Sequence, residues 1–200
     1  MGSIFGWSLG IGASVAALVV VAALKFQSPN LAYVHMAVAA VACTCIALAA
    51  VRELRKSESS ELLASVGVRY LGLIWTWGAL ALIVTYAFVL QWREWWHFSL
   101  VFVALAGAGL FLAATLRKDA ESGADDDTML KLARIWIRVH LGAAIITVVG
   151  LIVDGKMVRF LVPRHQDWAA QNIFFFGAIA LGIISWHALR AMRAVQPAKS

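Results

Sequence analysis

The chain alternates long apolar runs with short polar connections. A helix rises about 1.5 Å per residue and the hydrocarbon core of a membrane is about 30 Å thick, so about 20 apolar residues are enough to cross it. Six runs of the sequence reach that length. They predict a single all-α domain over residues 1–200, a polytopic transmembrane helical bundle with spans at 5–24, 31–51, 70–90, 97–116, 132–153 and 168–189.

Two of the connections are longer than a turn. Residues 57–68 are polar and then amphipathic, a pattern that predicts a short helix lying on the membrane surface. Residues 119–129 contain Gly123 and three consecutive aspartates. A calcium-binding EF-hand loop needs spaced oxygen ligands, a central glycine and a terminal glutamate, so adjacent aspartates predict a solvated loop instead.

Composition supports the membrane interpretation. Apolar residues make up 62% of the chain and charged residues 14%, and the mean hydropathy is +0.82. A soluble domain typically has about 45–50% apolar and about 25% charged residues. These values exclude a soluble globule, a disordered tail and a disulfide-rich secreted module. They leave an integral membrane protein, and we predict the bacterial inner membrane as its location.

The basic residues predict the orientation of the bundle. The formal net charge is +6, but Lys and Arg stand mainly at the ends of apolar runs, where they report topology and attraction to anionic lipid headgroups rather than nucleic-acid binding. With six spans, twelve basic residues fall on one side of the membrane and five on the other. Because basic residues are retained in the cytoplasm, both termini are predicted to be cytoplasmic.

Small residues at four-residue spacing predict close helix packing within lipid. Gly6, Gly10 and Ser14 form such a stripe on the first span, which we interpret as an uncleaved helix because Met1–Phe5 lacks a positive charge. The stripe is a candidate surface for a partner helix, and packing within one bundle is the alternative. Similar small residues occur in the fourth and sixth spans, namely Gly107, Gly109, Ala113, Ala178 and Gly182.

The histidines are the candidate cofactor-binding residues. His35 and His97 begin the second and fourth spans at the predicted outer side, and a weak internal repeat with an offset of 62 residues aligns them. His140 and His187 lie towards the inner side, on the fifth and sixth spans. Two imidazoles from different helices at one depth are able to ligate a haem iron axially. We predict no cofactor, because hydrogen-bonded structural histidines explain the same pattern, and haem b is the alternative.

The motifs of common catalytic sites are missing from the sequence, which contains no G-x-S-x-G, H-E-x-x-H, P-loop or C-x-x-C pattern. The centres of the predicted spans also lack Asp and Glu, which ion-coupled transporters usually place there. Cys43 and Cys45 are two residues apart on a helix and should point in different directions. We therefore predict a non-enzymatic accessory or structural membrane component, with a haem-b electron-transfer protein and a passive small-solute transporter as alternatives.

Overall fold

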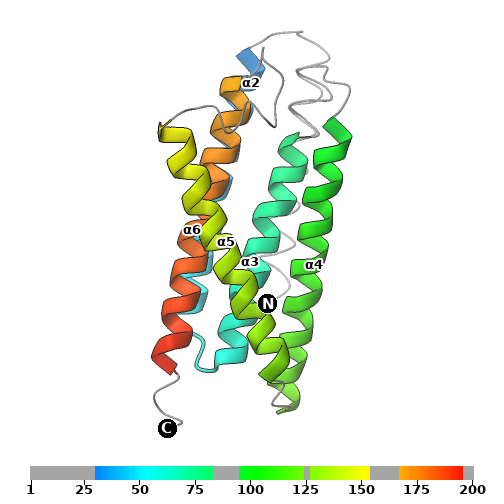
Figure 1. The fold of residues 1–200 in the computed structure, drawn as a ribbon, viewed down its shortest axis with the longest axis vertical. Helices are drawn as coiled ribbons and strands as arrows, with labels where there is room; N and C mark the ends of the chain where they lie inside the picture. Colours follow the sequence, from blue (N-terminus) through cyan, green and yellow to red (C-terminus); the bar gives the residue numbers. More distant parts are fainter. Residues whose placement is uncertain (1–29, 83–94, 124–126, 154–166, 196–200) are drawn as a thin grey trace.

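A computed structural model describes residues 30–82, 95–123, 127–153 and 167–195 of the chain. This part is helical throughout its regular structure and forms five helices, namely α2 (Asn30–Leu54), α3 (Ser60–Leu82), α4 (Trp95–Ser122), α5 (Asp127–Val153) and α6 (Asp167–Val195). The helices run alternately up and down along the long axis of the molecule (Figure 1). The predicted all-α class is confirmed for this part of the chain.

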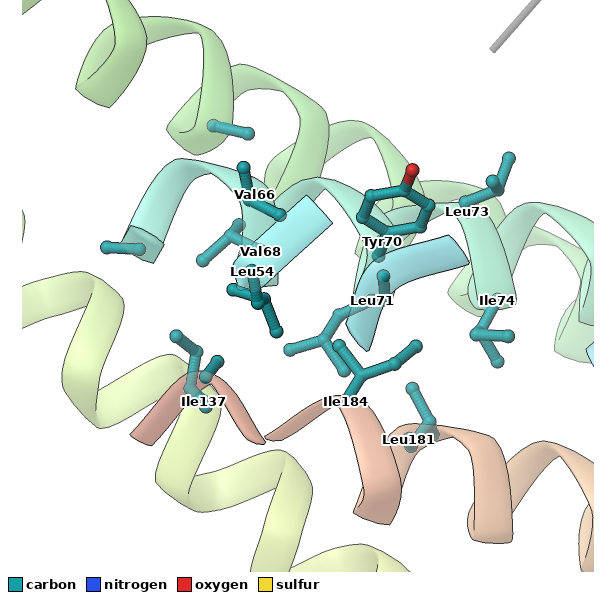
Figure 2. Close-up of a cluster of buried hydrophobic side chains, with 14 of the residues drawn as sticks. Leu54, Val66, Val68, Tyr70, Leu71, Leu73, Ile74, Ile137, Leu181 and Ile184 are labelled. Atoms are coloured by element: carbon teal, nitrogen blue, oxygen red, sulfur yellow. The ribbon is translucent and has the colours of Figure 1, made fainter. Parts of the chain in front are cut away.

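Helix α3 is the centre of the described bundle, because it contacts each of the other four helices. Most of its side chains from Leu63 onward are buried between α2, α4, α5 and α6. Figure 2 shows Val68 and Leu71 of α3 close to Leu54 of α2, with Ile137 of α5 and Ile184 of α6 on the opposite side of the cluster. These residues form one continuous apolar core.

Four of the described helices are long and apolar enough to cross a membrane. The segments that meet this condition are Ala37–Leu54 of α2, Ser99–Ser122 of α4, Asp127–Ile152 of α5 and Phe174–Val195 of α6. These four segments fall on the predicted spans 31–51, 97–116, 132–153 and 168–189. The predicted span 5–24 lies outside the described residues, as do residues 83–90 of the span 70–90, so a total of six spans stays a prediction.

The connection between α2 and α3 is shorter than the sequence suggested. Helix α3 begins at Ser60, ten residues before the predicted span, and the backbone amide of Leu62 donates a hydrogen bond to the Ser59 hydroxyl at 3.1 Å. Such a side-chain bond satisfies one of the free amides at a helix start. Leu63 and Ala64 are buried in the bundle rather than lying on a surface. The predicted surface helix at 57–68 is therefore largely the first two turns of α3.

The connection between α4 and α5 is also shorter than predicted. Helix α4 continues to Ser122, and Gly123 follows it with a φ of 69°, a left-handed conformation in which glycine avoids the strain of a Cβ atom. Helix α5 begins at Asp127, which forms an ion pair with Lys131 at 2.6 Å. The predicted loop over 119–129 is thus helical at both ends, over 119–122 and 127–129.

All Lys and Arg residues of the described part lie in one half of the bundle, the lower half in Figure 1, where α2 and α4 end and α3 and α5 begin. The opposite half has no described Lys or Arg, although polar residues such as His97, Gln171 and Asn172 belong to it. On α5, four residues share one face of the helix and are each more than half exposed: Ile135, Val139, Ile146 and Val149. Such a continuous apolar face is normal against lipid and unusual in water.

Candidate functional site

His140 of α5 takes part in two hydrogen bonds within the described bundle, both with tryptophan residues. Its Nε2 atom accepts a hydrogen bond from the indole nitrogen of Trp75 on α3 at 2.8 Å, and its Nδ1 atom lies 2.8 Å from the backbone carbonyl of Trp136. Because an indole N–H only donates, Nε2 must be the acceptor and Nδ1 must carry the proton. The two contacts therefore define a neutral imidazole in a single tautomer, with both ring nitrogens engaged.

Aromatic rings extend from this pair across the bundle. Trp75 packs edge-on against Phe102 of α4, with ring centroids 4.8 Å apart, and Phe102 packs edge-on against Phe174 of α6 at 6.0 Å. His140 also lies against the ring of Trp136 at 4.8 Å. Trp75 thus lies between helices, where its N–H meets a buried acceptor.

The predicted histidine pairs are only partly within the described structure. His35 belongs to α2, but its side chain is outside the described part, and the exposed His97 is on α4. In the inner pair, the ring contacts and hydrogen bonds of His140 among described residues are with Trp75 and Trp136. To ligate iron through Nε2, His140 would first have to leave Trp75. The arrangement of His140 does not fit axial haem ligation without that change, and haem b stays the alternative to the prediction that no cofactor is bound.

A second polar cluster joins α2 to α3 in the basic half of the bundle. Glu53 of α2 accepts hydrogen bonds from Arg69, with which it forms an ion pair, and from the Tyr70 hydroxyl at 2.7 Å. The side chains of Arg69 and Glu53 are 25% and 28% exposed. Sequence reasoning missed this cluster, although one signal was present: an arginine next to a long apolar run requires a partner or access to water.

The two cysteines point in different directions, as their spacing predicted. Cys43 is buried and Cys45 is exposed, and both are free thiols. Cys43 is thus part of the bundle core, whereas Cys45 faces its surroundings. No group of three or more His, Cys, Asp or Glu side chains among the described residues is arranged to hold a metal ion.

The described glycines of the fourth and sixth spans differ in how closely a neighbouring helix packs against them. A Cβ atom on Gly109 would lie 3.4 Å from the Cα atom of Gly72 in α3, and one on Gly182 would lie 3.4 Å from the Cβ atom of Ala144 in α5. Around Gly107, by contrast, a Cβ atom would meet nothing within 4 Å. The stripe formed by Gly6, Gly10 and Ser14 is outside the described residues, so its role as a surface for a partner helix stays a prediction.

One cavity of about 100 Å³ lies between the described helices, beside the Trp75–Phe102 contact, and is not fully enclosed. All five helices contribute to its wall, which consists mainly of alanine, glycine and aromatic side chains. The residues that line the cavity include Cys43, Trp77, Phe102, Thr147, Phe174 and Gly177. No sequence signal identified this cavity, because its wall is assembled from residues on helices far apart in the chain.

Comparison with known proteins finds no family model, no curated protein and no solved structure that matches this chain.

Proposed function

We propose that this protein is an integral component of the bacterial inner membrane with an accessory or structural role, oriented with its basic half towards the cytoplasm. The observation that carries the proposal is the division of the bundle surface. All Lys and Arg of the described residues gather in one half, whereas the exposed side chains along α5 towards the other half are apolar. A lipid bilayer has the same division between headgroup layer and hydrocarbon core.

The basic half also favours attraction to anionic headgroups. Arg138 on α5 and Arg190 and Arg193 on α6 are exposed on neighbouring helices. Exposed basic residues near an anionic leaflet each contribute about 1 kcal/mol of attraction, and the cytoplasmic leaflet carries most of the anionic lipid. The proposed orientation places these side chains at that leaflet.

Reporter fusions along the chain test this orientation. Fusions after Lys56, Lys118 and Lys199 should report a cytoplasmic location, and fusions after Gln27, Arg93 and Arg164 an external one. The protein should also stay with the membrane pellet after alkaline carbonate treatment, which removes peripheral proteins. A cytoplasmic reporter after Arg164 together with an external C-terminus would contradict the six-span topology.

Two measurements on the purified protein separate an accessory role from its alternatives. An absorption spectrum without a haem band, measured after expression with added haem precursor, would support a bundle that acts without this cofactor. Vesicles containing the protein should release trapped small solutes no faster than empty vesicles. A haem spectrum that is lost on replacement of His35 or His97, or protein-dependent solute release, would favour the electron-transfer or the passive-transporter alternative instead.

A further inference from the structure

The cavity between the five described helices has the size and the chemistry of a small ligand site. Its volume of about 100 Å³ is somewhat less than that of a cavity that accepts benzene, about 150 Å³. One small ring or a short piece of acyl chain therefore fills it. Because the cavity is not fully enclosed, the rest of a longer molecule is able to project between the helices towards the lipid.

The wall of the cavity favours a flat or slender apolar group. Phe102 and Phe174 stand edge to face at one side, and small residues such as Gly177 and Ala178 leave room beside them. A Cβ atom on Gly177 would meet nothing within 4 Å, so the open space begins directly at the α6 backbone. Apolar pockets of this kind bind ligands by contact area, and a few polar groups in the wall determine orientation.

Thr147 of α5 provides such a polar group. Threonine hydroxyls inside helices usually bond to the carbonyl four residues earlier, and Thr44, Thr76 and Thr115 do so at 2.8, 3.0 and 3.1 Å. The Thr147 hydroxyl makes no hydrogen bond within the described part of the chain, and its residue lines the cavity. Its O–H group is therefore available as a donor to a ligand.

Trp77 adds a second unsatisfied donor in the same wall. It is 8% exposed, and its indole nitrogen is buried without an acceptor among the described residues. A buried donor without a partner costs about 1–3 kcal/mol, so the immediate surroundings of the cavity favour a molecule that brings an acceptor. Hydrogen-bond acceptors in apolar molecules of a membrane are chiefly carbonyl oxygens, on quinone rings or on lipid esters.

We propose that this cavity binds an apolar membrane molecule through a carbonyl oxygen that accepts a hydrogen bond from the Thr147 hydroxyl. The aromatic and small residues of the wall hold the ring or chain next to that oxygen. Two kinds of membrane molecule carry a carbonyl group on an apolar body, namely quinones and lipid esters, and either could be the ligand. This binding goes beyond the membrane role proposed above, and neither depends on the other.

Three probes added to the purified full-length protein in detergent distinguish these sources. The first is a benzoquinone with a short alkyl tail, the second a medium-chain fatty acid methyl ester, and the third an alkylbenzene of matched length without oxygen. We expect saturable binding of the first or the second, measured by calorimetric titration. Binding of the alkylbenzene should be at least about fivefold weaker, which corresponds to one hydrogen bond of about 1 kcal/mol.

Variants of the cavity wall supply the structural test. Thr147→Val keeps the shape but removes the hydroxyl and should weaken binding of the carbonyl probe about fivefold, whereas Thr147→Ser should restore it. Gly177→Leu places a side chain in the open space and should abolish binding. Gly107→Leu is the matched control, because a side chain there also meets nothing within 4 Å but lies outside the cavity wall, and it should bind as the unmodified protein does.

Should Gly177→Leu fail to fold by circular dichroism, Ala143→Leu fills the same cavity from the exposed side of α5. If only the quinone binds, the natural ligand carries a ring carbonyl. If only the ester binds, the natural ligand is a lipid. If both bind, the site recognises a carbonyl group without selecting for a ring. The proposal is overturned if neither carbonyl probe saturates, if the alkylbenzene binds equally well, or if Thr147→Val or the folded cavity-filling variant leaves the affinity unchanged.

Discussion

Trp75 of α3 donates its indole N–H to Nε2 of His140 on α5 over 2.8 Å. The same imidazole is bonded through Nδ1 to the carbonyl of Trp136, one helical turn earlier on α5. Both ring nitrogens of His140 therefore have a hydrogen-bond partner inside an apolar bundle. The contact joins the central helix to α5, and it explains how a histidine is accommodated within a predicted membrane span.

The Trp75–His140 hydrogen bond should contribute to stability. His140→Leu leaves the Trp75 N–H without its acceptor and should lower the free energy of unfolding by about 1–3 kcal/mol. In a double-mutant cycle with Trp75→Phe, the coupling energy should be about 0.6–1.7 kcal/mol, between the average and the largest value typical of hydrogen bonds between membrane helices. Reversible unfolding in mixed micelles, followed by circular dichroism, measures both. Trp186→Phe, at an exposed tryptophan, is the control and should change stability little.

The contact of Glu53 with Arg69 and Tyr70 should stabilise the junction of α2 with α3. Glu53→Gln removes the charge opposite Arg69 and weakens the acceptor of the Tyr70 hydroxyl. The side chains are about one-quarter exposed, so water screens part of the loss, and we expect about 1–2 kcal/mol of destabilisation. The matched comparison is Glu121→Gln, which breaks the more exposed ion pair with Arg117 and should cost less than about 0.5 kcal/mol. Equal losses in the two variants would contradict this assignment.

Gly109 and Gly107 lie two residues apart on α4 and should respond differently to substitution. Gly109→Leu inserts a side chain where the Cα atom of Gly72 is 3.4 Å from the position of a Cβ atom, and the helices must separate. Overpacking of this kind costs about 1–3 kcal/mol. Gly107→Leu meets open space and should be neutral or slightly stabilising, since glycine is a poor helix former. Thermal unfolding of the two variants in one detergent gives the comparison.

The two cysteines should differ in reactivity towards a small, membrane-permeant maleimide. In the folded protein, the exposed Cys45 should be modified first, and Cys43, which is buried at the cavity wall, should react much more slowly than it does after unfolding. Mass spectrometry of the labelled protein counts the modified thiols, with Cys43→Ala and Cys45→Ala identifying each. Rapid labelling of the Cys45→Ala variant under native conditions would show that the α2 face carrying Cys43 is not packed as described.

The amino-acid sequence by itself determined the class of the protein. Runs of about 20 apolar residues separated by charged ends are long enough for helices to cross a membrane, and a helix satisfies its backbone amides without water. Within the described part, the predicted positions of α2, α4, α5 and α6 hold, because the length of an apolar run is a local property. The start of α3 was predicted ten residues too late, since Ser60 and Glu61 resemble a surface segment and only the surrounding helices bury the residues that follow.

Tertiary structure decided what each polar or small residue inside the spans does. The sequence offered His140 as one of four candidate haem ligands and gave no sign that Trp75, 65 residues earlier, would be its partner. In the same way, Gly107 and Gly109 look alike in the chain, but only Gly109 faces α3. The cavity beside Thr147 likewise requires all five described helices at once. Apolarity along the chain determines that helices enter a membrane, whereas packing between faces that are distant in sequence determines which groups meet.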